Sequence, residues 1–480
     1  MSDVITPPLG THVTVVNSIR VSVAMYLRLL TCLLAVGFAG IASSEPIAFP
    51  GAIGFGAGAI GWRGGEVIAV TTLEDKGEGS LRACVELDVP RVCVFQVSGT
   101  IELDSELRVG SNVYVAGQTA PGDGIQLKLR DSIRSPLVIK GAHDVVIRFL
   151  KVRPGPSIED SPAVDGITIE NAERIYIDHV SVMFATDENI NVHVSSSTAA
   201  DITIANSIFA YGLDKATHPK GAHSKGALIC SHEGSDNACG RITLTRNLFA
   251  HNRDRNPDLK ATDIGPIEVI NNVFYNAGSQ FGEFYNNLGT TRVNYVGNVV
   301  LAGPSTRKDR RFAVEAFLMD PQNLIEIFAK DNIAMDCKTA IPFEVLDPVA
   351  KDHQVATPAD PIASPVFSVS ETMTYVLDRA GDQIPGTREA DDLDARVLNH
   401  LRNRNCDGRI VDDPLADLGG WPEISAGREP AGSDGSGLAD ARDGLRPSFD
   451  LYDPQDAWAK LPGAETSNLE HYLARLAGDA

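Results

Sequence analysis

The densest group of residues suited to binding an anion lies between residues 215 and 260. This interval carries eight Lys or Arg residues against four acidic residues, whereas the whole chain has a formal net charge of −21. Lys225, Arg255 and Lys260 lie just before or after predicted strands of neighbouring repeats, so we expect them to share one face. Such a face suits a polymer that bears carboxylates. The alternative is a basic strip on an ordinary surface.

A second group of residues offers oxygen ligands. Asp165 opens one predicted strand region, and Asp187, Glu188 and Asn191 lie in the next repeat. Stacked repeats bring such side chains together, and hard oxygen ligands suit Ca²⁺. The sequence therefore predicts a calcium site, with a solvated acidic turn as the alternative. Beside a basic face, this site would suit a polyuronate, whose carboxylates need neutralisation and orientation.

The composition is that of a globular and acidic protein. Of the 480 residues, 43% are hydrophobic and 22% are charged, which excludes a disordered chain. The net charge argues against broad binding to nucleic acid or anionic membranes, so we expect neither as a partner. The length exceeds that of one ordinary compact core, which favours either several domains or an elongated architecture.

A repeat supplies the elements that position these groups. A motif of the form apolar-x-apolar-x-x-Asn-apolar starts at Ile242, Ile267 and Val293, with earlier relatives at Ile175 and Ile202. The starts are 27, 40, 25 and 26 residues apart. A period in the twenties with insertions is typical of a solenoid, whose coils bury one continuous core only by stacking.

The Asn of each motif, as in Asn247, Asn272 and Asn298, has a physical explanation. Strands of stacked coils lie about 4.8 Å apart, so Asn amides are able to hydrogen-bond along the stack as a ladder. The alternative is that Asn supplies turn conformations. Both interpretations favour an all-β fold, a right-handed parallel β-helix, over a β-sandwich, in which strands recur about every 8–12 residues.

The N-terminus and the cysteines predict export. The apolar run Leu29–Ala42 follows Arg20 and Arg28, and it is shorter than the roughly 20 residues that span a bilayer. We therefore expect a signal peptide over residues 1–44, Met25 being an alternative start, and a secreted protein, extracellular or periplasmic. The competing interpretation is a buried N-terminal helix. No later segment is predicted to cross a membrane.

Six cysteines remain after the predicted signal, an even number that fits disulfides in an exported chain. Six cysteines allow 15 pairings. The simplest pairing joins neighbours in sequence: Cys84 with Cys93, Cys230 with Cys239, and Cys337 with Cys406.

The pattern changes near residue 340, so we expect four regions. Residues 1–44 are the signal peptide, 45–340 the β-helix, 341–430 a segment that packs on the solenoid, and 431–480 a loosely ordered acidic tail. Helices are expected at Ala390–Arg402 and Ser467–Ala477.

Several stretches of this chain resemble the pectate lyases of polysaccharide lyase family 1, in particular their secreted, Gly-rich branch. The resemblance covers about residues 46–300 and again 419–423. The matching stretches are Ala48–Gly56, Gly79–Arg82, Ala116–Gly122, Ile177–His179, Ala185–Asn189, His223–Gly226 and Asn252–Pro257. Each is weak singly, and together they are specific.

The resemblance implies a right-handed parallel β-helix with an N-terminal cap helix at Gly79–Arg82, which cleaves polygalacturonate by calcium-assisted β-elimination as a monomer. It places Arg255 at the position of the catalytic arginine, with Lys225 beside it. The implied roles of the other residues are substrate binding for Lys260, Arg253 and His223, and calcium binding for Asp165, Asp187, Glu188 and Asn191.

The chain departs from the family pattern at three positions. Asn191 stands where an acid is found in well-known members, Ala163 where another acid is found, and Asp258 where a basic residue is frequent. Arg255 as a base is chemically awkward because arginine is almost always charged. We expect a dense cationic site to favour its neutral form.

Two other functions compete with the lyase. One is a β-helical glycoside hydrolase, which needs paired carboxylates about 5–10 Å apart; Asp187 and Glu188 are the candidates. The other is a non-catalytic solenoid that binds polysaccharide or mediates adhesion.

Overall fold

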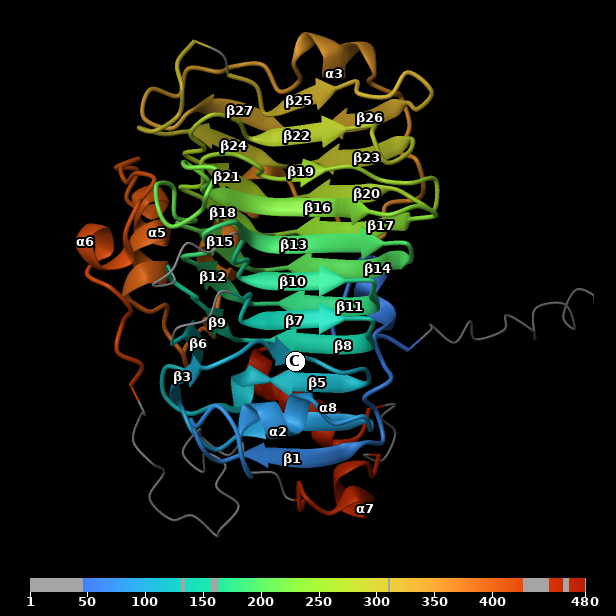
Figure 1. The fold of residues 1–480 in the computed structure, drawn as a ribbon, viewed down its shortest axis with the longest axis vertical. Helices are drawn as coiled ribbons and strands as arrows, with labels where there is room; N and C mark the ends of the chain where they lie inside the picture. Colours follow the sequence, from blue (N-terminus) through green and yellow to red (C-terminus); the bar gives the residue numbers. More distant parts are fainter. Residues whose placement is uncertain are drawn as a thin grey trace, which may run out of the picture. The chain divides into compact units, whose positions relative to one another are not determined.

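The structure is a computed structural model that describes residues 46–130, 134–156, 163–309, 311–425, 449–460 and 466–479. The predicted signal peptide lies outside the described residues. Three parallel sheets, A, B and C, make up the solenoid, and from β4 onward each coil contributes one strand to C, then A, then B (Figure 1). The predicted all-β parallel β-helix is confirmed.

The strands of each sheet stack in chain order. Sheet A contains β1 (Glu66–Val70), β2 (Arg91–Phe95), β5 (Val113–Ala116), β8 (His143–Arg148), β11 (Glu173–Asp178), β14 (Thr198–Ala205), β17 (Ala238–Thr245), β20 (Ile267–Ile270), β23 (Thr291–Val296) and β26 (Ile325–Lys330). Sheet B contains β3 (Gly99–Leu103), β6 (Ile125–Leu129), β9 (Lys151–Val152), β12 (Ser181–Met183), β15 (Ile208–Ala210), β18 (Leu248–Ala250), β21 (Val273–Tyr275), β24 (Val299–Ala302) and β27 (Ile333–Asp336). Sheet C contains β4 (Leu107–Arg108), β7 (Leu137–Lys140), β10 (Ile167–Glu170), β13 (Glu188–Ser195), β16 (Lys225–Glu233), β19 (Asp258–Leu259), β22 (Gly282–Tyr285) and β25 (Val314–Phe317).

The repeated motif forms the core because its first residues pair in register along sheet A. The paired residues are Ile175, Ile202, Ile242, Ile267 and Val293. All five side chains are buried, and full burial of one such side chain contributes about 1.5–3 kcal/mol. A shift of one residue would turn this whole column away from the core, so the pattern fixes the register.

The predicted Asn ladder is confirmed. The Nδ2 group of Asn247 donates to Oδ1 of Asn272 at 3.0 Å, Asn272 donates to Asn298 at 3.2 Å, and Asn298 donates to Asn332 at 3.0 Å. Each of these oxygens also accepts the backbone N–H of the preceding Asn in the ladder. The ladder thus satisfies buried polar groups at the turn from sheet A to sheet B, where unpaired groups would be costly.

Short helices close the solenoid and cover sheet B. The expected cap helix is α2 (Leu81–Val85), whose N-cap Ser80 accepts from the backbone of Ala83. The other helical segments are η1 (Phe55–Gly58), η2 (Gly117–Thr119), α3 (Pro348–Asp352), α4 (Val369–Arg379), α5 (Asp392–Arg402), α6 (Pro414–Leu418), α7 (Pro454–Ala457) and α8 (Asn468–Ala477). None of the helices in the described part of the chain has the length and apolar character that crossing a bilayer requires.

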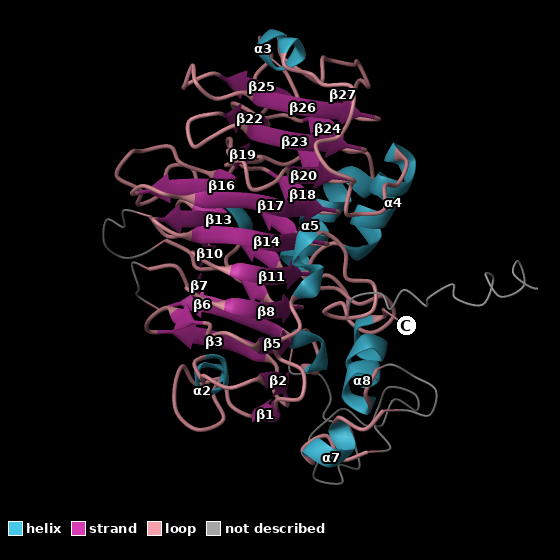
Figure 2. Ribbon diagram, turned by 90° about the vertical axis from the view of Figure 1, so that its right-hand side faces the viewer, coloured by secondary structure: helices cyan, strands magenta, loops and turns pink. Residues whose placement is uncertain are grey.

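Helices α4 and α5 lie against sheet B (Figure 2). Leu393, Val397 and Leu401 of α5 join an apolar cluster with Leu248 and Val273 of the sheet. Their spacing of four residues places them on one face of the helix. The helix expected at Ala390–Arg402 is therefore confirmed, and burial of this face accounts for its position on the solenoid.

The described part of the last fifty residues differs from the expected loose tail. This part contains α8, Asn468–Ala477, which begins with a capping box of Ser467 and Glu470. Leu469 and Leu473 pack in a cluster with Trp62, and Arg63 forms an ion pair with Glu470 at 2.6 Å. The helix expected at Ser467–Ala477 is therefore confirmed, and its apolar side chains pack on the N-terminal segment.

The three expected disulfides are present, Cys84–Cys93, Cys230–Cys239 and Cys337–Cys406.

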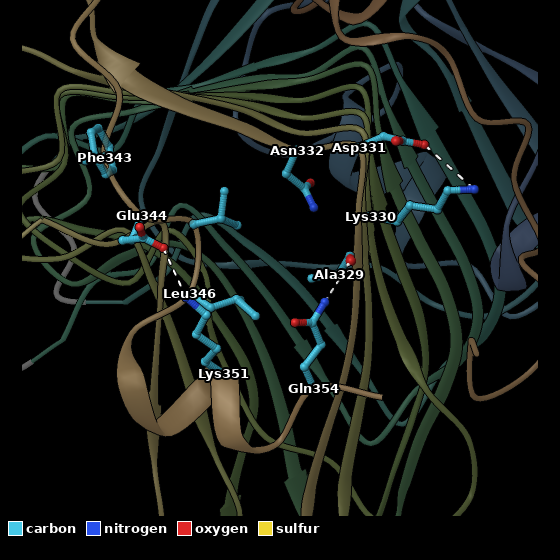
Figure 3. A pocket seen from close by; sticks show the side chains of 10 residues that line it. Ala329, Lys330, Asp331, Asn332, Phe343, Glu344, Leu346, Lys351 and Gln354 are labelled. Atoms are coloured by element: carbon cyan, nitrogen blue, oxygen red, sulfur yellow. Dashed lines mark hydrogen bonds and ion pairs between the residues drawn. The ribbon is translucent and has the colours of Figure 1, made fainter. Parts of the chain in front are cut away.

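At the C-terminal end of the solenoid a cavity of about 340 Å³ lies between β26 and the segment around α3 (Figure 3). Its charged side chains pair with each other, Lys330 with Asp331 and Lys351 with Glu344.

Candidate active site

The predicted site residues lie at the turns that lead from sheet B into sheet C. Asp187 comes just before β13, His223 just before β16, and Arg253 and Arg255 just before β19. Because the strands are parallel and in register, these turns stack: Glu188 pairs with Lys225, which bridges to Asp254. The repeat thus converts distant stretches of sequence into one continuous patch beside sheet C.

Three carboxyl groups form an acidic cluster. One oxygen from each of Asp165, Asp187 and Glu188 lies within 4.8 Å of the others. Burial, and then the charge of Asp187, raise the pKa of Asp165 to about 6. Burial and the two neighbouring carboxylates also hold the pKa of Glu188 well above its ordinary value. This is a set of like charges that a cation would relieve.

The acidic cluster fits a calcium ion. Oδ1 of Asp187 is buried and accepts no hydrogen bond from the described residues, although Nε2 of His223 lies 2.8 Å away outside hydrogen-bond alignment. A buried oxygen without a hydrogen bond is costly unless another partner supplies a positive charge. The donor set of carboxylate oxygens is that of a hard cation.

The structure places Asn191 beside Asp165, with its amide nitrogen toward that carboxylate. Its Nδ2 group donates to Oδ2 of Asp165 at 3.2 Å, and its oxygen accepts from the hydroxyl of Ser231 at 2.8 Å. The amide oxygen therefore points away from the acidic cluster, and Asn191 orients Asp165 instead. Ala163 offers no side-chain oxygen at all, so the cluster has three carboxylates.

His223 faces the acidic cluster. It lies beside Asp187, and its ring stacks on that of His218 with centroids 3.8 Å apart. Nε2 of His218 lies 3.6 Å from Asp187. Burial opposes the charge of Asp187, but its histidine neighbours outweigh burial and lower the pKa of this carboxyl. His218 and His223 therefore keep Asp187 ionised, next to the carboxyl groups of Asp165 and Glu188, whose pKa values are raised.

Arg255 occupies the centre of the patch and contacts Glu188 directly. Its Nε lies 3.7 Å from Asp258, and its backbone N–H donates to Glu283 at 2.9 Å. Burial opposes the charge of Arg255, but Glu188 and Asp258 outweigh it and raise the pKa of the guanidinium. The prediction that a cationic site favours the neutral form of Arg255 is therefore wrong for this structure. Carboxylates from two coils, Glu188 and Asp258, lie next to the guanidinium instead.

The other predicted basic residues are paired in the same way. Nζ of Lys225 lies 2.5 Å from Asp254, and Nζ of Lys260 lies 3.1 Å from Asp258. Arg253 makes two hydrogen bonds to Asp214, at 2.5 and 2.8 Å.

The patch is consequently not a basic strip. The four predicted basic groups face seven carboxyl groups: Asp165, Asp187, Glu188, Asp214, Asp254, Asp258 and Glu283. The positive charge of residues 215–260 is a property of the sequence interval alone, because neighbouring coils add acids to the same face.

Sequence reasoning missed His218, Asp214, Glu283 and Tyr285. Glu283 was detectable, because it lies 25 residues after Asp258, one repeat along, and pairs with it in register. His218 and Asp214 lie in the long turn before β16, where no repeat predicts which side chains meet.

Comparison with known proteins supplies a family. No protein-family profile matches the chain. The chain is 33% identical over 399 residues to a protein of Emericella nidulans named probable pectate lyase C, covering 82% of this chain and 85% of that one. It is 33% identical over 403 residues to a protein of the same name from Aspergillus terreus, covering 83% and 87%. Among solved structures, the cedar pollen allergen Jun a 1 is similar with a TM-score of 0.52 at 19% identity, covering 69% of this chain and 92% of that one.

Proposed function

This chain belongs to the pectate lyase family of polysaccharide-cleaving enzymes, and on that premise we propose that it cleaves polygalacturonate by β-elimination. The products are oligouronides with a 4,5-unsaturated end. The observation that supports this proposal is the contact of Arg255 with the acidic cluster through Glu188, one strand away from Lys225. One patch therefore holds the proposed base Arg255, the cation Lys225 and the carboxylate oxygens of the acidic cluster.

β-Elimination removes the proton at C5 and expels the oxygen at C4. In this proposal Arg255 takes the C5 proton and Lys225 stabilises the negative charge that develops on the neighbouring carboxyl group. With its present carboxylate partners, Arg255 is a firmly charged cation. It becomes a base only after it has released one proton to solvent, in a substrate complex in which Glu188 no longer contacts it.

Calcium is part of the proposal because the acidic cluster fits it. Asp165, Asp187 and Glu188 would hold the ion, with Asn191 orienting Asp165. When bound, the ion would neutralise the substrate carboxylate and thereby acidify the C5 proton.

The remaining predicted residues receive supporting roles. Lys260 and Arg253 lie on either side of Arg255 in the sequence and would bind the substrate chain. The side chain of Arg253 is 34% exposed, and that of Lys260 is 10% exposed. His223, predicted to bind substrate, acts through Asp187 in this proposal, since that carboxyl lies 2.8 Å from its ring. All these groups come from one chain, so we expect a monomer. The three disulfides support secretion.

The experiment is an incubation of the purified protein with polygalacturonate, once with added Ca²⁺ and once with a chelator. Ultraviolet absorbance of an unsaturated product that depends on Ca²⁺ is the expected result. New reducing ends without absorbance would identify a hydrolase and reject the elimination. Neither signal would leave a binding solenoid, and binding of the polymer would then be measured directly.

A further inference from the structure

Sheet C carries two carboxyl groups next to the predicted substrate-binding residues. Asp258 of β19 and Glu283 of β22 pair in register, and both are buried, with about 6% of each residue exposed. Asp258 already forms ion pairs with two cations, since it lies 3.1 Å from Nζ of Lys260 and 3.7 Å from Nε of Arg255. A substrate carboxylate at this place would compete with Asp258 for both.

Glu283 adds a carboxyl group that has no cationic partner among the described residues. Burial, and then the charges of Asp254 and Asp258, raise its pKa to about 7, so it is negatively charged above that pH. It accepts the backbone N–H of Arg255 at 2.9 Å and the hydroxyl of Tyr285 at 3.1 Å. These hydrogen bonds hold its carboxyl group between the backbone of Arg255 and the hydroxyl of Tyr285. Its position therefore makes the surroundings of Arg255 less favourable to a second anion.

Lys260 is enclosed on a further side by an aromatic stack. Its Nζ lies 5.2 Å from the centroid of the Tyr285 ring. That ring stacks on Phe317 of β25 with centroids 4.7 Å apart, and both side chains are partly exposed. The surface that continues from Lys260 along sheet C is thus aromatic and offers no cation at these two positions.

A fully ionised polyuronate carries one carboxylate on every unit, whereas a methyl-esterified unit carries none. The patch has more carboxyl groups than basic groups, and one bound dication would not reverse that excess. Repulsion between like charges in a partly buried site disfavours the ionised polymer. A methyl ester removes this repulsion, and its methyl group is able to contact the rings of Tyr285 and Phe317.

The chemistry of elimination agrees with this preference. The C5–H bond breaks, its electron pair forms the C4–C5 double bond, the C4–O bond breaks, and the leaving oxygen takes up a proton. Beside an ester no negative charge already sits on the carboxyl group, so the C5 proton is easier to remove than beside a carboxylate. An esterified unit therefore needs less neutralisation than the patch would have to provide for a free acid.

We infer that this chain, if it performs the proposed elimination, prefers partly methyl-esterified polygalacturonate, and that Asp258 and Glu283 set the preference. The test compares kcat/KM, from ultraviolet absorbance with added Ca²⁺, on a series of polymers from polygalacturonate to highly esterified pectin. For the wild type we expect a partly esterified polymer to exceed polygalacturonate by about fivefold or more. Asp258→Asn should shift the ratio toward polygalacturonate by about tenfold, and Glu283→Gln by about threefold, since each removes a like charge.

Asp263→Asn is the matched control. It removes one carboxylate three residues beyond Lys260, but Asp263 is 72% exposed in its side chain and pairs with Arg292 instead. It should leave the ratio unchanged. A wild type that is fastest on polygalacturonate, or a ratio that Asp258→Asn and Glu283→Gln do not move, would overturn the inference. If no polymer yields product, the proposed function fails separately, and affinity electrophoresis with the same polymers decides the preference: tighter binding of polygalacturonate overturns it, and tighter binding of esterified pectin supports it.

Discussion

Two clusters of charged side chains, one beside sheet B and one beside sheet C, differ in their balance of positive and negative groups. The tail cluster joins the solenoid to the segment around α5 and consists of Lys151, Arg153, Asp382, Arg388, Asp391 and Asp394. It contains three cations and three carboxylates, and each of them forms an ion pair with a member of the other set. The site patch contains four basic groups and seven carboxyl groups. A cluster complete in itself fits a structural role, whereas an excess of one sign fits a place where a ligand adds the missing charge.

The two clusters also differ in how their carboxyl groups titrate. In the tail cluster burial opposes the charge of Asp391, but Arg153 outweighs it and lowers the pKa to about 2. In the site patch burial and neighbouring acids raise the pKa of Asp165 to about 6 and that of Glu283 to about 7. Asp394 of the tail cluster is raised to about 6 as well, by burial and Asp391, so the difference is one of degree across the cluster.

The largest expected effect is a loss of kcat from a substitution in the site patch, which distinguishes this patch from the tail cluster by function. Arg255→Ala should lower kcat on the best substrate by about a thousandfold, near 4 kcal/mol of activation free energy, because the proposed base is lost. Circular dichroism should show an intact fold. Residual activity above a tenth of the wild type would remove Arg255 as the base.

The reverse result is expected in the tail cluster. Arg153→Ala leaves Asp391 and Asp394 without their shared cation, which should lower the free energy of unfolding by about 3 kcal/mol. Urea unfolding measures this loss, and kcat at a permissive temperature should stay within about twofold because Arg153 does not contact the patch. A large loss of kcat with unchanged stability would contradict the division of roles.

Calcium should stabilise the protein through the site patch alone. At a hundredfold excess over Kd, the free energy of unfolding should rise by about 2.7 kcal/mol. Calorimetric titration and thermal unfolding measure binding and stabilisation. Asp187→Asn should abolish both effects. Arg153→Ala should keep both, and a calcium response that Asp187→Asn leaves intact would place the ion elsewhere.

The smallest effect concerns pH in the presence of a chelator. The pKa of Asp165 is higher in the folded protein, about 6, than in the unfolded chain, about 3.9. The folded state therefore holds the proton longer, and stability falls as pH rises from about 4 to about 6, by up to about 2 kcal/mol. Asp165→Asn should flatten this fall, measured by urea unfolding across the pH range, although Asp394 and Glu283 contribute in the same direction. An identical slope in the variant would show that Asp165 titrates normally.

The fold was predictable because the sequence repeat directly indicates a stack of parallel coils. Ile242, Ile267 and Val293 recur at fixed spacing, and a parallel stack is the arrangement that buries them together with Asn272. The positions of Arg255, Lys225 and Asp187 followed from the resemblance and from the same stacking. Their partners did not, because an ion pair depends on which side chains from adjacent coils face one another. Asp258 thus stood out only as one of three departures from the family pattern. Glu283 was detectable only through its spacing of one repeat from Asp258, and Asp214 carried no visible signal.

The disulfide between Cys337 and Cys406 spans 69 residues of sequence. It joins the last strand region of the solenoid to the end of the segment that contains α4 and α5. A protease that cuts the connection between α3 and α4 would therefore release no fragment: the two pieces would stay covalently joined until a reductant acts. Outside the cell, where proteases are common and reductants scarce, such a nicked enzyme would keep its covering of sheet B in place.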